Sequence, residues 1–250
     1  MKNMNNKKLL TRIFSFTLLL CSFTSTTFAS PSIAAPRPNI GKAENLQIIR
    51  EIMPNFDKNT LVVFDVDLTL IKGKQGFPSI SNGADLIDKA TPKLIRDLQK
   101  KGIKVIALTH SSSEKETMKW LDSTQGELMP FSNIRFQQLQ HFGINFSSAF
   151  PKIDHTYLSI STNSPPYFLE SGHPCFYKGI IFTNTISDKG IVLSAFLDQF
   201  ELSPNFIIFI DDNLQQNIVV AKSLEKLKAD KENPLRNYIC LHYTAASTGK

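Results

Sequence analysis

The stretch that decides the fold is Leu61-Val-Val-Phe-Asp-Val-Asp-Leu-Thr-Leu-Ile71. Its first residues are apolar, they follow the polar residues 58–60, and the carboxylates Asp65 and Asp67 come directly after them. A short apolar run of this kind predicts a strand buried on both faces, as in a parallel sheet. Because side chains alternate along a strand, Asp65 and Asp67 are expected to point the same way. The pair therefore predicts a site for a divalent cation and a phosphoryl group at the end of the strand, where open α/β sheets bind ligands.

On its own, the pair is equally consistent with a plain strand end, because Asp is common in turns. The rest of the chain favours a site, since strands and helices alternate along it. Strands are expected at 61–64, 103–108, 179–183 (with an alternative start at Tyr177), 205–210 and 237–243. Helices are expected at 43–53, 91–101, 114–122, 136–142, 189–200 and 214–227. The alternation predicts an α/β fold: a doubly wound, Rossmann-like parallel sheet of about five strands flanked by helices.

Three of the predicted strands end in polar residues that parallel strands would bring to one edge of the sheet. The first strand ends at Asp65, Asp67 and Thr69, the second at Thr109 and Ser111, and the fourth at Asp211 and Asp212. Lys189 begins the helix that leads into the fourth strand. Residues 72–83 are expected to form a loop or hairpin beside the carboxylates.

The order of these residues resembles the haloacid dehalogenase (HAD) superfamily of phosphohydrolases. Its four motifs match Asp65-Val-Asp-Leu-Thr69, Thr109, Lys189 and Asp211-Asp212, so the resemblance covers residues 61–213. The segments Gly179-Ile-Ile-Phe-Thr, Lys189-Gly-Ile-Val-Leu and Phe209-Ile-Asp-Asp-Asn look like a poorly characterised secreted bacterial HAD-like family. The resemblance implies a HAD-like hydrolase domain.

The resemblance also implies a role for each matching residue. Asp65 would be the nucleophile that forms an aspartyl-phosphate, and Asp67 the general acid and base. Mg²⁺ would be held by Asp65, Asp67 (through its backbone carbonyl) and Asp211. The phosphoryl oxygens would be bound by Thr109, Ser111 and Lys189, with Thr69 and Asp212 in support. Haloacid dehalogenases proper lack the carboxylate at Asp67, so carbon–halogen chemistry is disfavoured.

Three positions leave alternatives open. Leu68 departs from the small residue usual in the first motif, which affects the turn after Asp67 but removes no reactive group. Lys178 is a rival to Lys189, which is preferred because it begins a helix, where the dipole also favours an anion. His110 either contacts substrate or is an exposed histidine beside Thr109.

The spacing of the motifs bears on substrate access. The 44 positions from Asp65 to Thr109 leave no room for a large cap, whereas the 80 positions from Thr109 to Lys189 allow a small cap insertion at about 124–178. An open site would accept a phosphorylated macromolecule, and a small cap would favour small phosphomonoesters. The sequence is consistent with either substrate.

The N-terminal residues have the pattern of a secretory signal. Residues 1–29 hold four basic residues and no acid, followed by an apolar stretch and small residues before Ser30. We therefore expect cleavage after residue 29, a linker at 30–41, one domain at 42–250, and export to the periplasm or beyond without a stable membrane anchor. Those four charges account for most of the net charge of +6, so nucleic-acid binding is not expected.

The function predicted from these observations is a secreted, Mg²⁺-dependent phosphatase that acts on phosphomonoesters. A phosphotransferase using the same intermediate is one alternative, and a catalytically inactive binding or host-interaction protein is another. Cys175 and Cys240 would both remain after cleavage, and the sequence leaves open whether they pair.

Overall fold

A computed structural model of the chain describes residues 39–73, 83–113, 131–160, 173–184 and 188–246. They belong to one compact unit that spans residues 37–250. The predicted signal peptide (1–29) and helix 114–122 lie outside the described residues. No helix in the described part of the chain is both long and apolar enough to cross a membrane.

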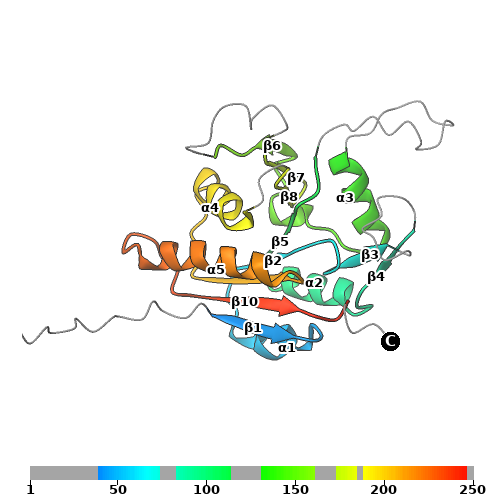
Figure 1. Ribbon diagram of the computed structural model, residues 1–250, viewed down its shortest axis with the longest axis horizontal. Helices are drawn as coiled ribbons and strands as arrows, with labels where there is room; N and C mark the ends of the chain where they lie inside the picture. The colour runs from blue at the N-terminus through cyan, green and yellow to red at the C-terminus, as the bar shows by residue number, and fades with distance from the viewer. Residues whose placement is uncertain (1–38, 74–82, 114–130, 161–172, 185–187, 247–250) are drawn as a thin grey trace, which may run out of the picture. The chain divides into compact units, whose positions relative to one another are not determined.

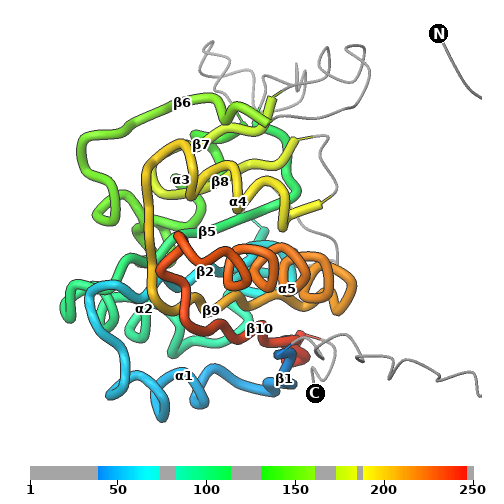
Figure 2. Tube along the Cα trace, turned by 90° about the vertical axis from the view of Figure 1, so that its left-hand side faces the viewer, coloured from blue at the N-terminus to red at the C-terminus, as the bar shows by residue number. Residues whose placement is uncertain are grey.

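Within the described residues, eight strands form the main sheet, in the order β1-β10-β9-β2-β5-β8-β7-β6 (Figures 1 and 2). All neighbours are parallel except at β7, which is antiparallel to both β8 and β6. The strands are β1 (Ile40–Ala43), β2 (Thr60–Phe64), β5 (Lys104–Thr109), β6 (His155–Tyr157), β7 (Cys175–Tyr177), β8 (Ile180–Phe182), β9 (Phe206–Asp211) and β10 (Asn237–Tyr243).

The prediction of a mostly parallel sheet is confirmed, but the predicted number of about five strands is wrong. The expected strands correspond to β2, β5, β8, β9 and β10, and the sheet also contains β1, β6 and β7. These three strands are only three or four residues long and carry no regular apolar pattern, so they could not be predicted by periodicity. The predicted linker at 30–41 overlaps β1, whose Ile40 pairs with Cys240 of β10.

Helices cover both faces of the sheet, and each face has its own hydrophobic core. On one face, Val62 and Phe64 of β2 share a core with α1 (Gln47–Ile52), α2 (Thr91–Lys100) and α3 (Phe131–His141). On the other, Leu61 and Val63 pack with α4 (Lys189–Gln199) and α5 (Leu214–Ala229). In Figure 1, α4 and α5 lie to the left of the central strands, and α2 and α3 lie to the right. Alternate residues of β2 thus face alternate layers, as burial on both faces requires.

The remaining elements are short. A hairpin of β3 (Ile71–Gly73) and β4 (Ala84–Leu86) forms a second, two-stranded antiparallel sheet, consistent with the predicted loop or hairpin. Two 3₁₀ helices, η1 (Met53–Asn55) and η2 (Ser147–Ala149), complete the described elements. The described part of the predicted cap region (124–178) supplies α3 to one face and β6 and β7 to the edge of the main sheet.

The two cysteines lie far apart in the sheet. Both thiols are buried, that of Cys175 in β7 and that of Cys240 in β10. Four strands separate β7 from β10, which at the usual strand spacing corresponds to about 24 Å. A disulfide requires Cα atoms within about 7 Å. The fold therefore excludes a disulfide between them.

Candidate active site

The candidate site lies where the parallel strands β2 and β9 end side by side. Phe64 of β2 is paired with Ile210 of β9, and the backbone N–H of Asp65 donates to the Ile210 carbonyl at 2.8 Å. From β2 the chain goes on to β5 on one side, and from β9 it goes on to β10 on the other. Such a reversal is the position at which open α/β sheets bind ligands. Asp65, just after β2, and Asp211, at the end of β9, are therefore neighbours.

Lys189 joins these two carboxylates. Its Nζ lies 2.5 Å from Asp65 Oδ1 and 2.7 Å from Asp211 Oδ2. All three residues are buried, with at most 4% of each exposed. Charged groups are buried only when they are paired, and here one ammonium serves two carboxylates.

The start of α4 holds Lys189 in this position. The side chain of Asp188 caps the helix by accepting from the backbone N–H groups of Gly190 and Ile191. At Gly190, α4 approaches α5 so closely that an added Cβ would lie 2.5 Å from Ser223 Oγ and 2.7 Å from the Val219 carbonyl oxygen. Lys189 thus lies between a residue that caps the helix, Asp188, and a residue at which α4 and α5 are in close contact, Gly190.

The electrostatics of the three groups show an excess of negative charge. Burial, reinforced by Asp211 and Asp67, raises the pKa of Asp65 to about 8 although Lys189 opposes the shift. Burial alone would lower the pKa of Lys189, but Asp65 and Asp211 outweigh it and raise that pKa. The neighbouring carboxylates act in the same direction on both groups, because two buried carboxylates share a single ammonium.

A third carboxylate completes an acidic cluster. One oxygen each of Asp65, Asp211 and Asp212 lies within 4.8 Å of the other two. Burial and the neighbouring Asp211 raise the pKa of Asp212 to about 6. Buried carboxylate oxygens with surplus negative charge are the donor set that a hard divalent cation prefers, so these residues fit Mg²⁺. The cluster contains the side chain of Asp212, which was expected in a supporting role, and Asp67 was expected to bind the metal through its backbone carbonyl.

Asp67 lies in an adjacent hydrogen-bonded group. Its Oδ2 accepts from Thr109 Oγ1 at 3.2 Å, from Ser111 Oγ at 3.1 Å and from Arg135 Nη2 at 3.1 Å. Arg135 Nη2 is also 2.9 Å from Asp67 Oδ1. The structure therefore brings together Asp67, Thr109 and Ser111 as the sequence predicted.

Arg135 is the site residue that sequence reasoning missed. It lies on α3, where Phe131, Arg135 and Leu139 are all buried at a spacing of four residues. The helix predicted at 136–142 excludes Arg135, whereas α3 begins at Phe131. The available signal was its position between two apolar residues, Phe131 and Leu139, at helical spacing, which indicates that Arg135 lies on the buried face of the helix.

Thr69 and Leu68 shape the turn that follows Asp65. Thr69 Oγ1 accepts from the backbone N–H of Asp212 at 3.0 Å, which joins the turn after β2 to the loop after β9. Leu68 has φ of 63°, in the left-handed region that non-glycine residues rarely adopt. Its N–H donates to the Ile71 carbonyl at 2.8 Å. The turn is thus closed by backbone bonds even with a large residue at position 68.

Lys178 and His110, the residues left open in the sequence, form no hydrogen bond or ion pair with the buried carboxylates among the described residues. Lys178 Nζ contacts Asp154 at 3.6 Å and lies over the rings of Phe136 and Tyr177, so Lys189 is the lysine that reaches the acidic residues. His110 is exposed, and its Nδ1 lies 2.9 Å from Thr183 Oγ1. Desolvation of the ring and the charge of Lys189 lower the pKa of His110.

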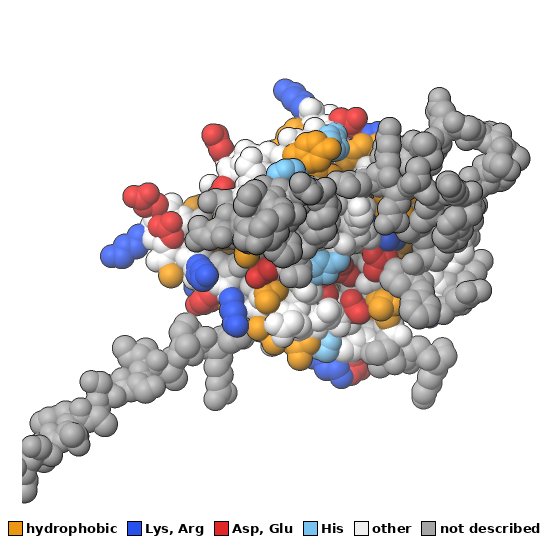
Figure 3. Space-filling model, turned by 45° about the horizontal axis from the view of Figure 1, so that its top comes forward, with side chains coloured by type: hydrophobic (Ala, Val, Ile, Leu, Met, Phe, Trp, Pro, Cys, Tyr) orange, Lys and Arg blue, Asp and Glu red, His pale blue; other side chains and the backbone are white. Residues whose placement is uncertain are grey.

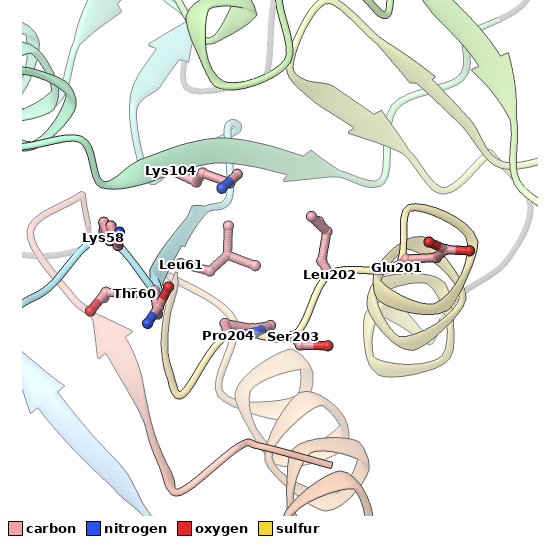
Figure 4. Close-up of a pocket in the computed structure, with 9 residues that line it drawn as sticks. Lys58, Thr60, Leu61, Lys104, Glu201, Leu202, Ser203 and Pro204 are labelled. Atoms are coloured by element: carbon pink, nitrogen blue, oxygen red, sulfur yellow. The ribbon is translucent and has the colours of Figure 1, made fainter. Parts of the chain in front are cut away.

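A separate pocket lies at the opposite edge of the sheet. It has a volume of about 190 Å³ and is lined by the amino ends of β2 and β5 and by residues 201–204 (Figure 4). The acidic residues follow the carboxyl ends of the strands, so this pocket is not part of the candidate site. Figure 3 shows a different region of the surface, where acidic and histidine side chains lie near one another.

The fold and the site together define an α/β protein with a lysine-bridged acidic cluster at the carboxyl edge of a parallel sheet. The chain belongs to the family described as "Protein of unknown function (DUF2608)", which matches residues 79–250. This match includes Thr109, Arg135 and Lys189 but begins after Asp65 and Asp67.

One relative is similar over most of the chain. It is a protein of Rickettsia bellii (strain RML369-C) named "Uncharacterized protein", 26% identical over 218 residues, and the match covers 71% of each chain. No solved structure matches the chain.

Proposed function

We propose that this protein is a Mg²⁺-dependent phosphatase of the HAD superfamily, exported from the cell, that hydrolyses phosphomonoesters through an aspartyl-phosphate on Asp65. The observation that carries the proposal is the buried bridge from Lys189 to Asp65 and Asp211, next to the hydrogen-bonded group of Asp67, Thr109 and Ser111. These are the residues that resemble the four HAD motifs. They come from separate parts of the chain and meet at one sheet edge.

In the proposed first step, a carboxylate oxygen of Asp65 attacks phosphorus and the bond from phosphorus to the leaving oxygen breaks. Asp67 gives a proton to that leaving oxygen, so the alcohol departs neutral. In the second step, water attacks the phosphorus of the aspartyl-phosphate and Asp67 takes up its proton. Inorganic phosphate leaves and Asp65 is restored.

The other residues stabilise charge during these steps. Lys189 lies within hydrogen-bonding distance of Asp65, where it can neutralise charge that develops on the phosphoryl oxygens. Asp65, Asp211 and Asp212 would hold Mg²⁺, which when bound polarises the phosphoryl group. Thr109 has its hydroxyl at the end of β5, beside Asp67, where it can donate to the same group.

The test is release of phosphate from an aryl phosphate by the full chain, with Mg²⁺ and with chelator. Asp65→Asn should lose turnover, because the amide cannot act as the nucleophile. Asp198→Asn is the matched control, since Asp198 is an exposed carboxylate on α4 outside the site. Turnover by Asp65→Asn equal to that of the control would contradict the mechanism.

Adding glycerol to the same assay separates hydrolysis from phosphoryl transfer to an alcohol. Under the proposal, inorganic phosphate is the main product with or without glycerol. Glycerol phosphate as the main product would favour a phosphotransferase instead. An absence of turnover on a broad set of phosphomonoesters would favour a binding protein.

A further inference from the structure

Arg135 comes from a different segment than the other residues of the candidate site, which end or follow β2, β5 and β9 or begin α4. Arg135 lies on α3, between β5 and β8, and 1% of it is exposed. Its Nη2 contacts both oxygens of Asp67 and Ser111 Oγ, the last at 3.0 Å. Its Nη1 donates to Gln138 Oε1 at 3.0 Å, one helical turn further along α3. The guanidinium is thus fixed between its own helix and the carboxylate.

These contacts determine where the carboxylate of Asp67 points. One guanidinium nitrogen contacts both of its oxygens, and two hydroxyls bind Oδ2. Burying an arginine is costly unless its charge is paired, so the contact with Asp67 is needed to keep Arg135 in the interior. The reverse also holds, because Arg135 is the cation that the described residues place on Asp67.

We propose that Arg135 is a positioning residue, which together with Ser111 orients the carboxylate of Asp67 for proton transfer to the leaving group. The inference rests on the proposed phosphatase function and adds that the segment between β5 and β8 takes part in the chemistry. Proton transfer requires that the carboxyl group lie within hydrogen-bonding distance of the leaving oxygen. If Asp67 is displaced, it no longer protonates the leaving group, whereas Asp65 can still attack phosphorus.

The choice of leaving group isolates this effect. An alkyl phosphate releases an alcohol whose anion is unstable, so its cleavage depends strongly on protonation. p-Nitrophenyl phosphate releases a stable phenolate and depends on it little. The ratio of the two kcat/KM values therefore reports on Asp67 as the acid, because kcat/KM covers the reaction only up to formation of the aspartyl-phosphate, before Asp67 acts as a base. Because both values come from one sample, the ratio does not change if part of a variant is unfolded.

The experiment measures this ratio for the full chain and for the Arg135→Gln, Arg135→Lys and Ser111→Ala variants. Arg135→Gln should lower kcat/KM for an alkyl phosphate about 10²-fold, the lower end of what general acid catalysis contributes, and kcat/KM for p-nitrophenyl phosphate less than tenfold. Arg135→Lys should recover part of the ratio, because lysine keeps the charge without the planar fork. Ser111→Ala should shift the ratio in the same direction as Arg135→Gln. This variant provides the test if neither Arg135 variant folds.

Arg96→Gln is the matched control. Arg96 lies on α2 and donates to the Gly143 carbonyl at 3.1 Å, just after α3, so its loss loosens α3 without a direct contact to Asp67. Its ratio should equal that of the unaltered chain. In the background of Asp67→Asn, Arg135→Gln should have no further effect on the ratio.

The outcomes separate the two proposals. If the unaltered chain hydrolyses neither substrate, the phosphatase function fails. If the unaltered chain is active but the Arg135 and Ser111 variants lose both rates equally, or Arg96→Gln changes the ratio as much, the positioning role is wrong and Arg135 only anchors α3.

Discussion

Replacing Lys189 with methionine should strongly destabilise the metal-free protein. Methionine keeps the length and apolar stem of the side chain but removes the ammonium, which lies 2.5 Å and 2.7 Å from two buried carboxylate oxygens. Hydrogen bonds to charged groups contribute about 1.5–3 kcal/mol each, and breaking a buried ion pair costs about 3–5 kcal/mol. We therefore expect a loss of about 3–5 kcal/mol in the free energy of unfolding.

The expected shift is large enough for a simple assay. For a chain of this size, 1 kcal/mol corresponds to about 2–4 °C in Tm, so the variant should melt about 6–20 °C lower in chelator. Thermal unfolding followed by circular dichroism measures this directly. Lys178→Met is the control, because the pair of Lys178 with Asp154 is at the surface and contributes at most about 1 kcal/mol.

Addition of Mg²⁺ extends the test. A divalent cation bound by Asp65 and Asp211 would replace the missing positive charge, so Mg²⁺ should raise the Tm of Lys189→Met more than that of the unaltered chain. A Tm for Lys189→Met within about 4 °C of the Lys178→Met value in chelator would refute the reasoning, since it would mean that the ammonium is not the main counter-charge of the two carboxylates.

Three further predictions follow from the site and the sheet. Because burial raises the pKa of Asp212 to about 6, this group takes up a proton as pH falls through 6; affinity for Mg²⁺, measured by calorimetry, should fall between pH 7 and 5, and Asp212→Asn should weaken that dependence. Gly190→Ala should cost about 1–3 kcal/mol in urea unfolding, because its Cβ would overlap Ser223 and Val219 of α5; an unchanged midpoint would show that the two helices separate freely. Since Cys175 and Cys240 are buried and too far apart to form a disulfide with each other, a reducing agent should leave Tm unchanged, and both thiols should react with an alkylating reagent only after unfolding; a drop in Tm on reduction would contradict the sheet order.

The central part of the sheet could be predicted because its strands have a strong local pattern. β2, β5 and β9 are apolar runs that end in polar residues, and their parallel direction follows from the helices that join them. The same rule was enough to bring Asp65, Asp211 and Lys189 to one edge. These predictions required no knowledge of side-chain contacts.

The parts that could not be predicted depend on contacts between distant segments. β6 and β7 have three residues each and are strands only because they pair with each other and with β8. The spacing around Arg135 indicates that its side chain is buried but not what it contacts, since its partner Asp67 is 68 positions away in the chain. The grouping of the Asp212 side chain with Asp65 and Asp211 likewise depends on side-chain directions in two loops, which a sequence pattern does not determine.

The position of β1 and β10 in the sheet has a consequence for the order of folding. β1 lies at the edge and pairs only with β10, within the described residues, so Ile40 finds Cys240 as its partner near the other end of the chain. β2, which precedes Asp65, likewise lacks its neighbour β9 until residue 206 has been synthesised. Pairings this far apart in sequence close large loops and form slowly. During synthesis, the bridge from Lys189 to Asp65 and Asp211 is therefore completed only when most of the chain has emerged.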